Sequence, residues 1–189
     1  FDADWFHSEH ESGPPRYFIH IPTKAYYSAI KICLAGGEPE LAHSILKAGC
    51  IGPSDEVDMR LPDSSRSHLF NLVMSGYSQI GDFENAQLLL DEMQSIGPRP
   101  TEHTYAAFIT SLAMADKLDE ATNVIDSMLR NENGDGILPG SSSFGACMLA
   151  ALKAKAYQQV LGLNTKMIDA GISPNSQSYF GVVLASTRL

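Results

Sequence analysis

The fold of this chain is decided by residues 68–101, which read HLFNLVMSGYSQIGDFENAQLLLDEMQSIGPRPT. Apolar residues recur every three or four positions on both sides of Gly81-Asp82, as they do in amphipathic helices. Glycine favours the end of one helix, and aspartate favours the start of the next. Gly97 and the prolines that follow it predict the end of the second helix. The segment is therefore expected to form a helical hairpin.

The same hairpin pattern occurs again in 103–140 and 142–175. An aromatic residue marks each first helix, at separations of 35, 39 and 35 residues: Phe70, Tyr105, Phe144 and Tyr179. The four extra residues of the longer unit fall within 131–136, where the composition predicts a turn. A more degenerate unit occupies 23–49 and is followed by a stretch, 50–67, that we expect to be a loop.

These repeats predict an all-α fold, a right-handed superhelical α-solenoid of about four to five two-helix repeats. A single pair of short helices cannot bury its apolar face, whereas stacked pairs share one continuous core. The expected divisions are an N-terminal extension or cap at 1–22, a degenerate repeat with a loop insertion at 23–66, a repeat at 67–101, a repeat with a turn insertion at 102–140, a repeat at 141–175, and the first helix of a truncated repeat at 176–189. Cys33 and Cys147 fall at apolar positions of first helices and are expected to be buried thiols.

The charge distribution excludes a uniformly cationic nucleic-acid binder, because 13 basic residues face 22 acidic ones and give a net charge of −9. Most acidic residues of 67–140 fall in the second helices, which we expect to form the outer surface. Residues 141–189 carry four basic residues and one acidic residue. No apolar run approaches the roughly 18 residues of a membrane-spanning helix.

The 35-residue period and its signature residues resemble the pentatricopeptide repeat family, and they fit the 34-residue tetratricopeptide repeat less well. The resemblance rests on a Thr/Ser–aromatic step that opens the first helix, as in Thr104-Tyr105, and on a closing Gly-x-x-Pro such as Gly171–Pro174. It implies a protein of mitochondria or chloroplasts that binds single-stranded RNA and acts in RNA processing, stability or translation. In this family each repeat presents side chains to one unstacked base.

The resemblance assigns base reading to the residue after the motif aromatic together with the residue after the closing proline. The resulting pairs are Asn71 with Thr101, Ala106 with Gly140, and Gly145 with Asn175. Only Asn71 and Thr101 both carry hydrogen-bonding side chains, and Asn71 resembles the pyrimidine readers of the family.

The family pattern also suggests which residues contact the rest of each nucleotide. His68 and His103 lie just before each first helix is expected to begin, at a place where the family often has an apolar residue that packs against the base. Two interpretations stay open: each imidazole stacks on a base, or it is a partly exposed residue at the start of the helix. Lys153 is the one lysine at the place that faces the phosphates, where the other units carry Ala35, Gln79 and Met114.

Two other functions compete with RNA binding. The neutral reading positions and the acidic net charge favour a protein-interaction scaffold within an organellar complex, either as a monomer or as a subunit. A weaker alternative is an accessory arm of a larger RNA-processing enzyme. We expect no catalytic activity, no cofactor and no metal, because the calcium-like run at 131–136 lacks the terminal Glu ligand and His7 and His10 lack a clear third ligand.

Overall fold

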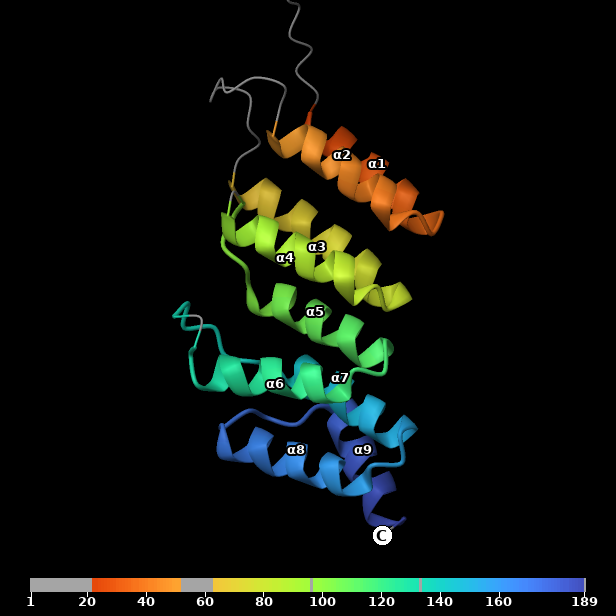
Figure 1. Ribbon diagram of the computed structural model, residues 1–189, viewed down its shortest axis with the longest axis vertical. Helices are drawn as coiled ribbons and strands as arrows, with labels where there is room; N and C mark the ends of the chain where they lie inside the picture. The colour runs from red at the N-terminus through yellow and green to blue at the C-terminus, as the bar shows by residue number, and fades with distance from the viewer. Residues whose placement is uncertain (1–21, 52–62, 96, 133, 189) are drawn as a thin grey trace, which may run out of the picture.

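The computed structural model describes residues 22–51, 63–95, 97–132 and 134–188, which form nine α-helices and no strand (Figure 1). The helices are α1 (Thr23–Ala35), α2 (Pro39–Ile51), α3 (Asp63–Ile80), α4 (Phe83–Ser95), α5 (Glu102–Met114), α6 (Leu118–Leu129), α7 (Ser141–Lys153), α8 (Tyr157–Asp169) and α9 (Ser176–Ser186). The predicted all-α class is confirmed. Within these ranges, no helix has the length and the apolar character needed to cross a membrane.

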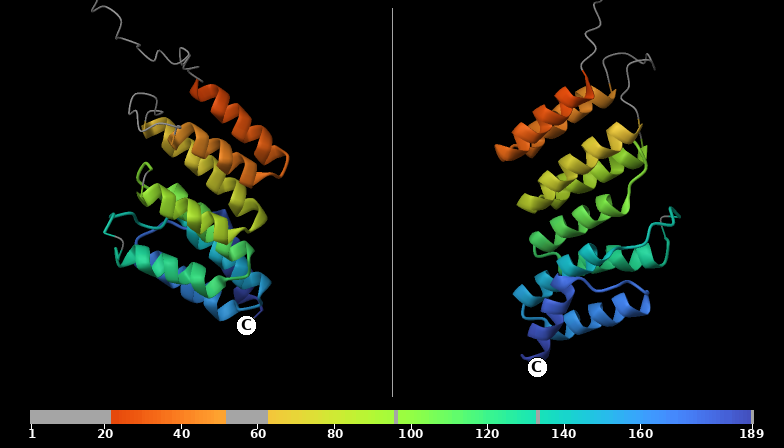
Figure 2. Two further views of the ribbon diagram at one scale, coloured as in Figure 1. Left: turned by 45° about the horizontal axis from the view of Figure 1, so that its top comes forward. Right: turned by 180° about the vertical axis from the view of Figure 1, so that it is seen from behind.

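The helices form antiparallel hairpins that stack along one axis, with α1 at one end and α9 at the other (Figures 1 and 2). The first helices α1, α3, α5, α7 and α9 contact one another in succession. Each second helix contacts its own first helix and the first helix of the next hairpin. Among the described residues, the backbones of α2, α4, α6 and α8 lie farther apart, and these helices meet through long side chains, as in the ion pair between Lys166 on α8 and Asp126 on α6. The closely packed continuous layer is therefore made of first helices.

The turn inside each hairpin has the same backbone geometry in all four cases. One residue adopts a left-handed conformation, with φ of 77° at Gly37, 73° at Gly81, 59° at Asp116 and 58° at Lys155. The amide after it donates a hydrogen bond to a carbonyl five residues earlier, which closes the end of the first helix. Glycine adopts this conformation without strain, whereas aspartate and lysine do so at a cost.

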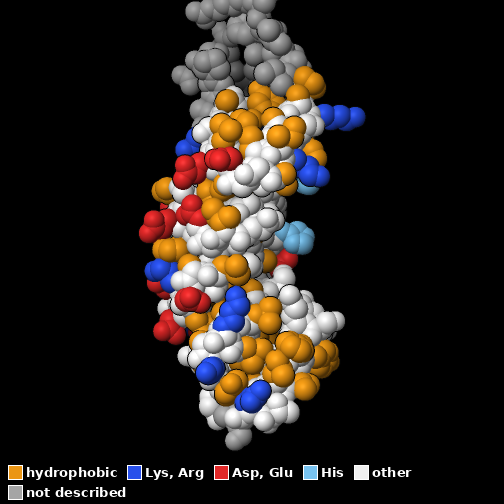
Figure 3. Space-filling view, turned by 90° about the vertical axis from the view of Figure 1, so that its right-hand side faces the viewer, with side chains coloured by type: hydrophobic (Ala, Val, Ile, Leu, Met, Phe, Trp, Pro, Cys, Tyr) orange, Lys and Arg blue, Asp and Glu red, His pale blue; other side chains and the backbone are white. Residues whose placement is uncertain are grey.

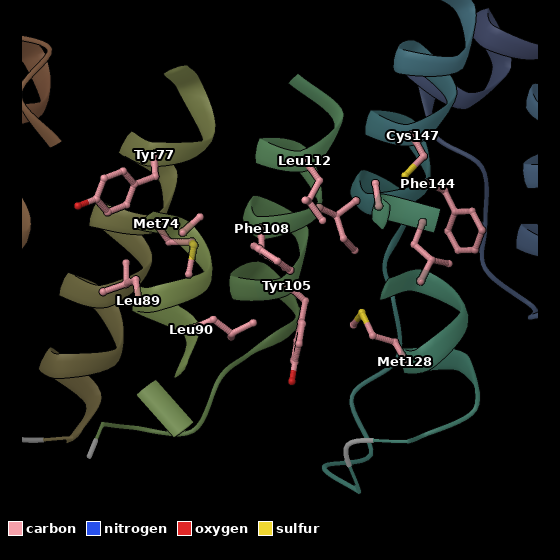
Figure 4. Close-up of a cluster of buried hydrophobic side chains, with 14 of the residues drawn as sticks. Met74, Tyr77, Leu89, Leu90, Tyr105, Phe108, Leu112, Met128, Phe144 and Cys147 are labelled. Atoms are coloured by element: carbon pink, nitrogen blue, oxygen red, sulfur yellow. The ribbon is translucent and has the colours of Figure 1, made fainter. Parts of the chain in front are cut away.

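The core lies between the helices and is built from equivalent residues of successive hairpins (Figure 4). Phe70, Tyr105 and Phe144 are all buried, and so are the four repeating methionines, Met74, Met93, Met128 and Met167. A small residue in each second helix is fully buried and lets the two helices approach closely: Ala42, Ala86, Ala121 and, as a valine, Val160.

Two expectations from the sequence are wrong. Helix α3 begins at Asp63, so the last five residues of the expected 50–67 loop are helical. Its first turn holds Asp63, Ser64 and Ser65, which are residue types that stabilise a helix N-terminus. Cys147 is buried, but Cys33 is only half-buried and is not a core thiol. The expected cap at 1–22 and the histidines His7 and His10 lie in a part of the chain outside the described residues, apart from position 22.

A buried polar network joins the first hairpin to the second. His43 Nδ1 lies 3.0 Å from the Tyr77 hydroxyl, and His43 Nε2 lies 2.8 Å from Glu92 Oε2. Lys47 forms an ion pair with the other oxygen of Glu92. Burial raises the pKa of Tyr77 to about 12. Burial also raises the pKa of Glu92, but hydrogen bonds from Lys47 and His43 outweigh it and lower that pKa below its ordinary value.

Candidate functional site

The expected site residues lie on the layer of first helices, which we call the first-helix surface and define by α1, α3, α5, α7 and α9. Asn71 lies on α3, Ala106 on α5, Gly145 on α7, and Lys153 at the last turn of α7. Thr101, Gly140 and Asn175 are the N-cap residues of α5, α7 and α9. Each expected reading pair therefore joins a residue within one first helix to the cap of the next.

The Asn71 side chain is held by the cap of α5. The Thr104 hydroxyl donates to Asn71 Oδ1 at 2.7 Å, and Asn71 Nδ2 lies 3.5 Å from Thr101 Oγ1. Thr101 and Thr104 also form a capping box, because each hydroxyl accepts a hydrogen bond from the other residue's backbone N–H. This network fixes the amide so that its oxygen faces Thr104, leaving one amide hydrogen for another acceptor.

The pair of Ala106 and Gly140 offers no hydrogen-bonding side chain. Ala106 is buried in α5. A Cβ atom on Gly140 would overlap the Glu102 carboxylate, so the space beside this cap is already filled. The Ser143 hydroxyl, equivalent to that of Thr104, is buried and has no hydrogen-bond partner among the described residues, because Gly140 has no side chain to meet it.

The third pair is occupied by its own helix cap. Asn175 Oδ1 accepts from the backbone N–H of Ser178 at 2.9 Å, and it lies 3.1 Å from the Ser178 hydroxyl. Asn175 Nδ2 donates to the Ser141 carbonyl at 3.3 Å. A Cβ atom on Gly145 would lie 2.9 Å from the Gln177 side-chain oxygen. The oxygen and one amide hydrogen of Asn175 are thus engaged within the protein, and its oxygen caps its own helix.

The two histidines differ in their surroundings. His68 stacks on Tyr27, with ring centroids 5.3 Å apart and planes at 17°. His103 is exposed, and its Nδ1 lies 3.5 Å from Glu102 Oε2. The expectation that both precede their helices is wrong: His68 is the sixth residue of α3, and His103 is the second residue of α5. Both still lie on the first-helix surface, one turn before the reading position.

The segment at 131–136, whose sequence is similar to the start of a calcium loop, contains a turn that is stabilised by the side chains of Asn131 and Asp135. The Tyr105 hydroxyl donates to Asp135 Oδ2 at 2.8 Å, and the Gly136 N–H donates to Asn131 Oδ1 at 2.8 Å. The backbone N–H of Ile137 donates to the other oxygen of Asp135. These contacts explain how the inserted residues are tolerated between α6 and α7.

Sequence reasoning missed the role of Thr104. The repeating Thr/Ser–aromatic step was the available signal, since Thr104, Ser143 and Ser178 are all fully buried. A buried hydroxyl normally has a hydrogen-bond partner, so its recurrence beside a reading position indicated a contact. The partner, Asn71, lies 33 residues away and was visible only once the hairpins were stacked.

Charge separates the two sides of the molecule. In Figure 3 acidic side chains gather along one side, and a histidine projects from the opposite side. Glu84, Asp91, Glu92, Asp119, Glu120 and Asp126 all lie on the second helices α4 and α6. Helix α3 has only Asp63 and Arg66 as charged residues, both in its first turn. The first-helix surface is therefore far less acidic than the net charge suggests.

Comparisons with known proteins indicate one family. Residues 66–114 match a model described as the PPR repeat family, and residues 103–133 match a PPR repeat model. Two curated relatives from Arabidopsis thaliana are named pentatricopeptide repeat-containing proteins, and one of them is named chloroplastic. They are 29% identical over 113 residues and 30% identical over 119 residues, each across 60% of this chain. The matched parts make up only 20% and 15% of those relatives, so this chain spans a small fraction of their length.

Solved structures with the same fold include the maize pentatricopeptide repeat protein PPR10 in complex with an 18-nucleotide psaJ RNA element. Its TM-score is 0.67 at 16% identity, covering 87% of this chain and 22% of that one. The PPR domain of Arabidopsis thaliana protein-only RNase P 1, in complex with tRNA, gives a TM-score of 0.64 at 13% identity, covering 89% of this chain and 82% of that one. These likenesses show a helical repeat solenoid.

Proposed function

This chain is a pentatricopeptide repeat protein, and from that premise we propose that it binds single-stranded RNA on its first-helix surface. The observation that carries the proposal is the Asn71 amide, which Thr104 and Thr101 hold in one orientation on that surface. Solved proteins of the same fold are titled as complexes with RNA, which supports the same class of ligand here.

The Asn71 amide reads a base by donating its free hydrogen to a base-edge acceptor. The Thr101 hydroxyl lies beside this amide, 3.5 Å from Asn71 Nδ2, and supplies a second polar group to the same base. We assign a pyrimidine to this place, following the family pattern. His103, exposed one turn before the next reading position, supplies a ring on which a base stacks. The His68 ring already stacks on Tyr27, and it extends this aromatic platform toward α1.

The remaining reading positions bind RNA weakly. Ala106, Gly140 and Gly145 present no donor or acceptor, and Asn175 is engaged as a cap. Lys153 is the expected phosphate contact. With about two or three phosphates neutralised, the logarithm of the binding constant should fall with the logarithm of salt concentration with a slope of roughly −2.

We further propose that the protein acts in mitochondria or chloroplasts, in RNA processing, stability or translation. A relative named chloroplastic supports this assignment. In this proposal the repeats supply RNA binding.

The proposal is tested by fluorescence anisotropy with a labelled pyrimidine-rich single-stranded RNA at low salt. Asn71→Ala should weaken binding by roughly tenfold, since one good side-chain contact to a base is worth about 1–3 kcal/mol. Asn123→Ala is the matched control, because Asn123 is exposed on α6 and lies on the opposite surface. Equal binding by both variants, or no binding by the unaltered chain at tens of micromolar, contradicts the proposal.

A further inference from the structure

An apolar groove of about 520 Å³ lies on the first-helix surface at the C-terminal end, between α5, α7 and α9. Its walls include Met114, Leu149, Phe180 and Leu184, together with the small residues Ala113 and Ala146. Met114, Phe180 and Leu184 are exposed although all three are large and apolar. Such a concentration of exposed apolar side chains on one face marks an interaction site.

This groove is distinct from the end of the helical stack. Tyr179 and Val183, also exposed on α9, are equivalent by repeat position to Phe144 and Met148, which are buried between neighbouring helices. Those two side chains therefore point along the stacking axis. Phe180 points into the groove instead. Tyr179 and Phe180 are equally exposed, at 62% and 57%, so they form a matched pair on two different faces of one helix.

Positive charge borders the groove. Lys153 lines it, and the exposed Lys155 and Arg188 follow the ends of α7 and α9. Asp169 is the one acidic residue in 141–189. In Figure 3 a broad area of hydrophobic side chains lies in the lower part of the molecule, and Lys and Arg side chains lie along its edge on the left of the view. An apolar centre with a cationic border complements a ligand with the opposite arrangement of charge.

We propose that this groove binds an amphipathic helix of a partner protein whose apolar face is flanked by Asp and Glu. A helix satisfies its own backbone hydrogen bonds, whereas an extended peptide would need partners that a wall of apolar side chains on helices lacks. RNA fits this part of the surface less well, because Ala106 and Gly145 offer its bases no side-chain hydrogen bond. The inference does not depend on RNA binding at Asn71.

The groove sets the length of the partner helix. It crosses three neighbouring helices, and packed helices lie about 8–10 Å apart, so the groove is roughly 20 Å long. A rise of about 1.5 Å per residue gives a helix of roughly 13 residues, or between three and four turns.

The test uses the full chain and a fluorescein-labelled 14-residue peptide with leucines at a three-to-four spacing and glutamates elsewhere. A scrambled peptide of the same composition is the ligand control. We expect the amphipathic peptide to bind and the scrambled one to bind at least tenfold more weakly. Phe180→Ser should weaken binding by tenfold or more, whereas Tyr179→Ser should leave it within twofold. Both residues are exposed, so neither change should unfold the protein.

A charge reversal then tests the border. Lys153→Glu should weaken peptide binding and reduce its dependence on salt, because exposed border charges act mainly through long-range attraction. Equal effects of Phe180→Ser and Tyr179→Ser would overturn the proposal, as would equal binding of the two peptides. Formation of a dimer of the chain through the groove would appear as a molecular mass that rises with protein concentration and as loss of the bound peptide. That result would also overturn the proposal, and it would assign the groove to a second copy of the chain. Stronger competition by single-stranded RNA than by unlabelled peptide would assign it to RNA.

Discussion

Thr104 is the residue on which the proposed reading position at Asn71 depends most, because it holds the Asn71 amide. It is fully buried and links the cap of α5 to the amide of Asn71. A hydroxyl at this place has two effects, since it stabilises a helix N-terminus and sets which end of the neighbouring amide is free. The structural and the functional contribution of Thr104 can be separated by choice of substitution.

Thr104→Val should destabilise the protein by about 1–2 kcal/mol, because it removes one member of a capping box and a buried hydrogen bond while keeping the shape. It should also weaken RNA binding at the Asn71 position, because the amide loses its fixed orientation. Thr104→Ser keeps the hydroxyl and should retain the binding. The two variants are compared by urea denaturation and by anisotropy with the same RNA, at protein concentrations where both are folded. If valine and serine bind RNA equally, Thr104 has only a structural role.

Glu92 should make the stability of the protein depend on pH. Its pKa is lower in the folded chain than its ordinary value of 4.5, because Lys47 and His43 hydrogen-bond its charged form more strongly than burial opposes it. The stabilisation is therefore present above about pH 4.5 and is lost as pH falls below that value. Urea denaturation of the wild type and Glu92→Gln should show a stability difference at pH 7 that shrinks toward pH 3.

Glu84→Gln supplies the control for this pH dependence, since Glu84 is exposed on the same helix and its substitution should change stability little at any pH. A difference between wild type and Glu92→Gln that stays constant from pH 7 to pH 3 would show that the network contributes through packing, not charge.

At the scale of the elements, the hairpin turn shows how far sequence reasoning reached. Gly81-Asp82 predicted a turn, and Gly81 has a left-handed backbone conformation in the structure. Asp116 and Lys155 adopt the same conformation without being glycine, and only their place in the repeat indicated it. The early start of α3 was missed because Ser64, Ser65 and Ser67 suit loops as well as helix N-termini.

Lys155→Gly should stabilise the protein. Lysine in a left-handed conformation destabilises the folded chain by about 1–2 kcal/mol, and glycine removes this strain. Glycine also makes the unfolded chain more flexible, which offsets about 0.5–1 kcal/mol of that gain. The net gain of up to about 1 kcal/mol should raise the melting temperature by roughly 2–4 °C. Lys155→Ala removes the same side chain but keeps the strain, so it should melt close to the wild type in the same calorimetry. Equal melting temperatures for the two variants would mean that the turn relaxes around lysine without strain.

The sequence predicted which residues form each proposed reading pair, but it did not predict which other side chains surround them. The spacing brought Asn71 and Thr101 together, as the structure shows. It did not reveal that Asn175 is engaged as a cap, or that the space beside Gly140 is filled by Glu102. The cap itself is local, since its partner Ser178 is three residues away, but the contacts of Asn175 with Ser141 and of Glu102 with Gly140 join residues more than 30 positions apart. The groove at Phe180 was hidden for the same reason, because three helices from different hairpins form it.

At the scale of the whole molecule, stability should vary along the stack. In a solenoid each hairpin contacts only its neighbours, so the stability of a helix depends on how many neighbours cover it. Within the described part of the chain, α5 contacts α3, α4, α6 and α7, whereas α9 contacts only α7 and α8 and leaves four large apolar side chains exposed. Helix α1 is covered by α2 and α3 alone among the described residues.

Hydrogen exchange followed by mass spectrometry should therefore show the slowest exchange in α5, with faster exchange in α1 and the fastest in α9. The amphipathic peptide should slow exchange in α9 and in the C-terminal turns of α5 and α7, because its site is built from those helices. RNA should instead protect the middle of α3 and the N-terminal turn of α5, around Asn71 and Thr101. Exchange at one common rate along the chain would mean that the stack opens as a single cooperative unit, contrary to the pattern of contacts. Protection of α9 by RNA, or of the middle of α3 by the peptide, would mean that the first-helix surface is one site, because separate sites must leave separate footprints.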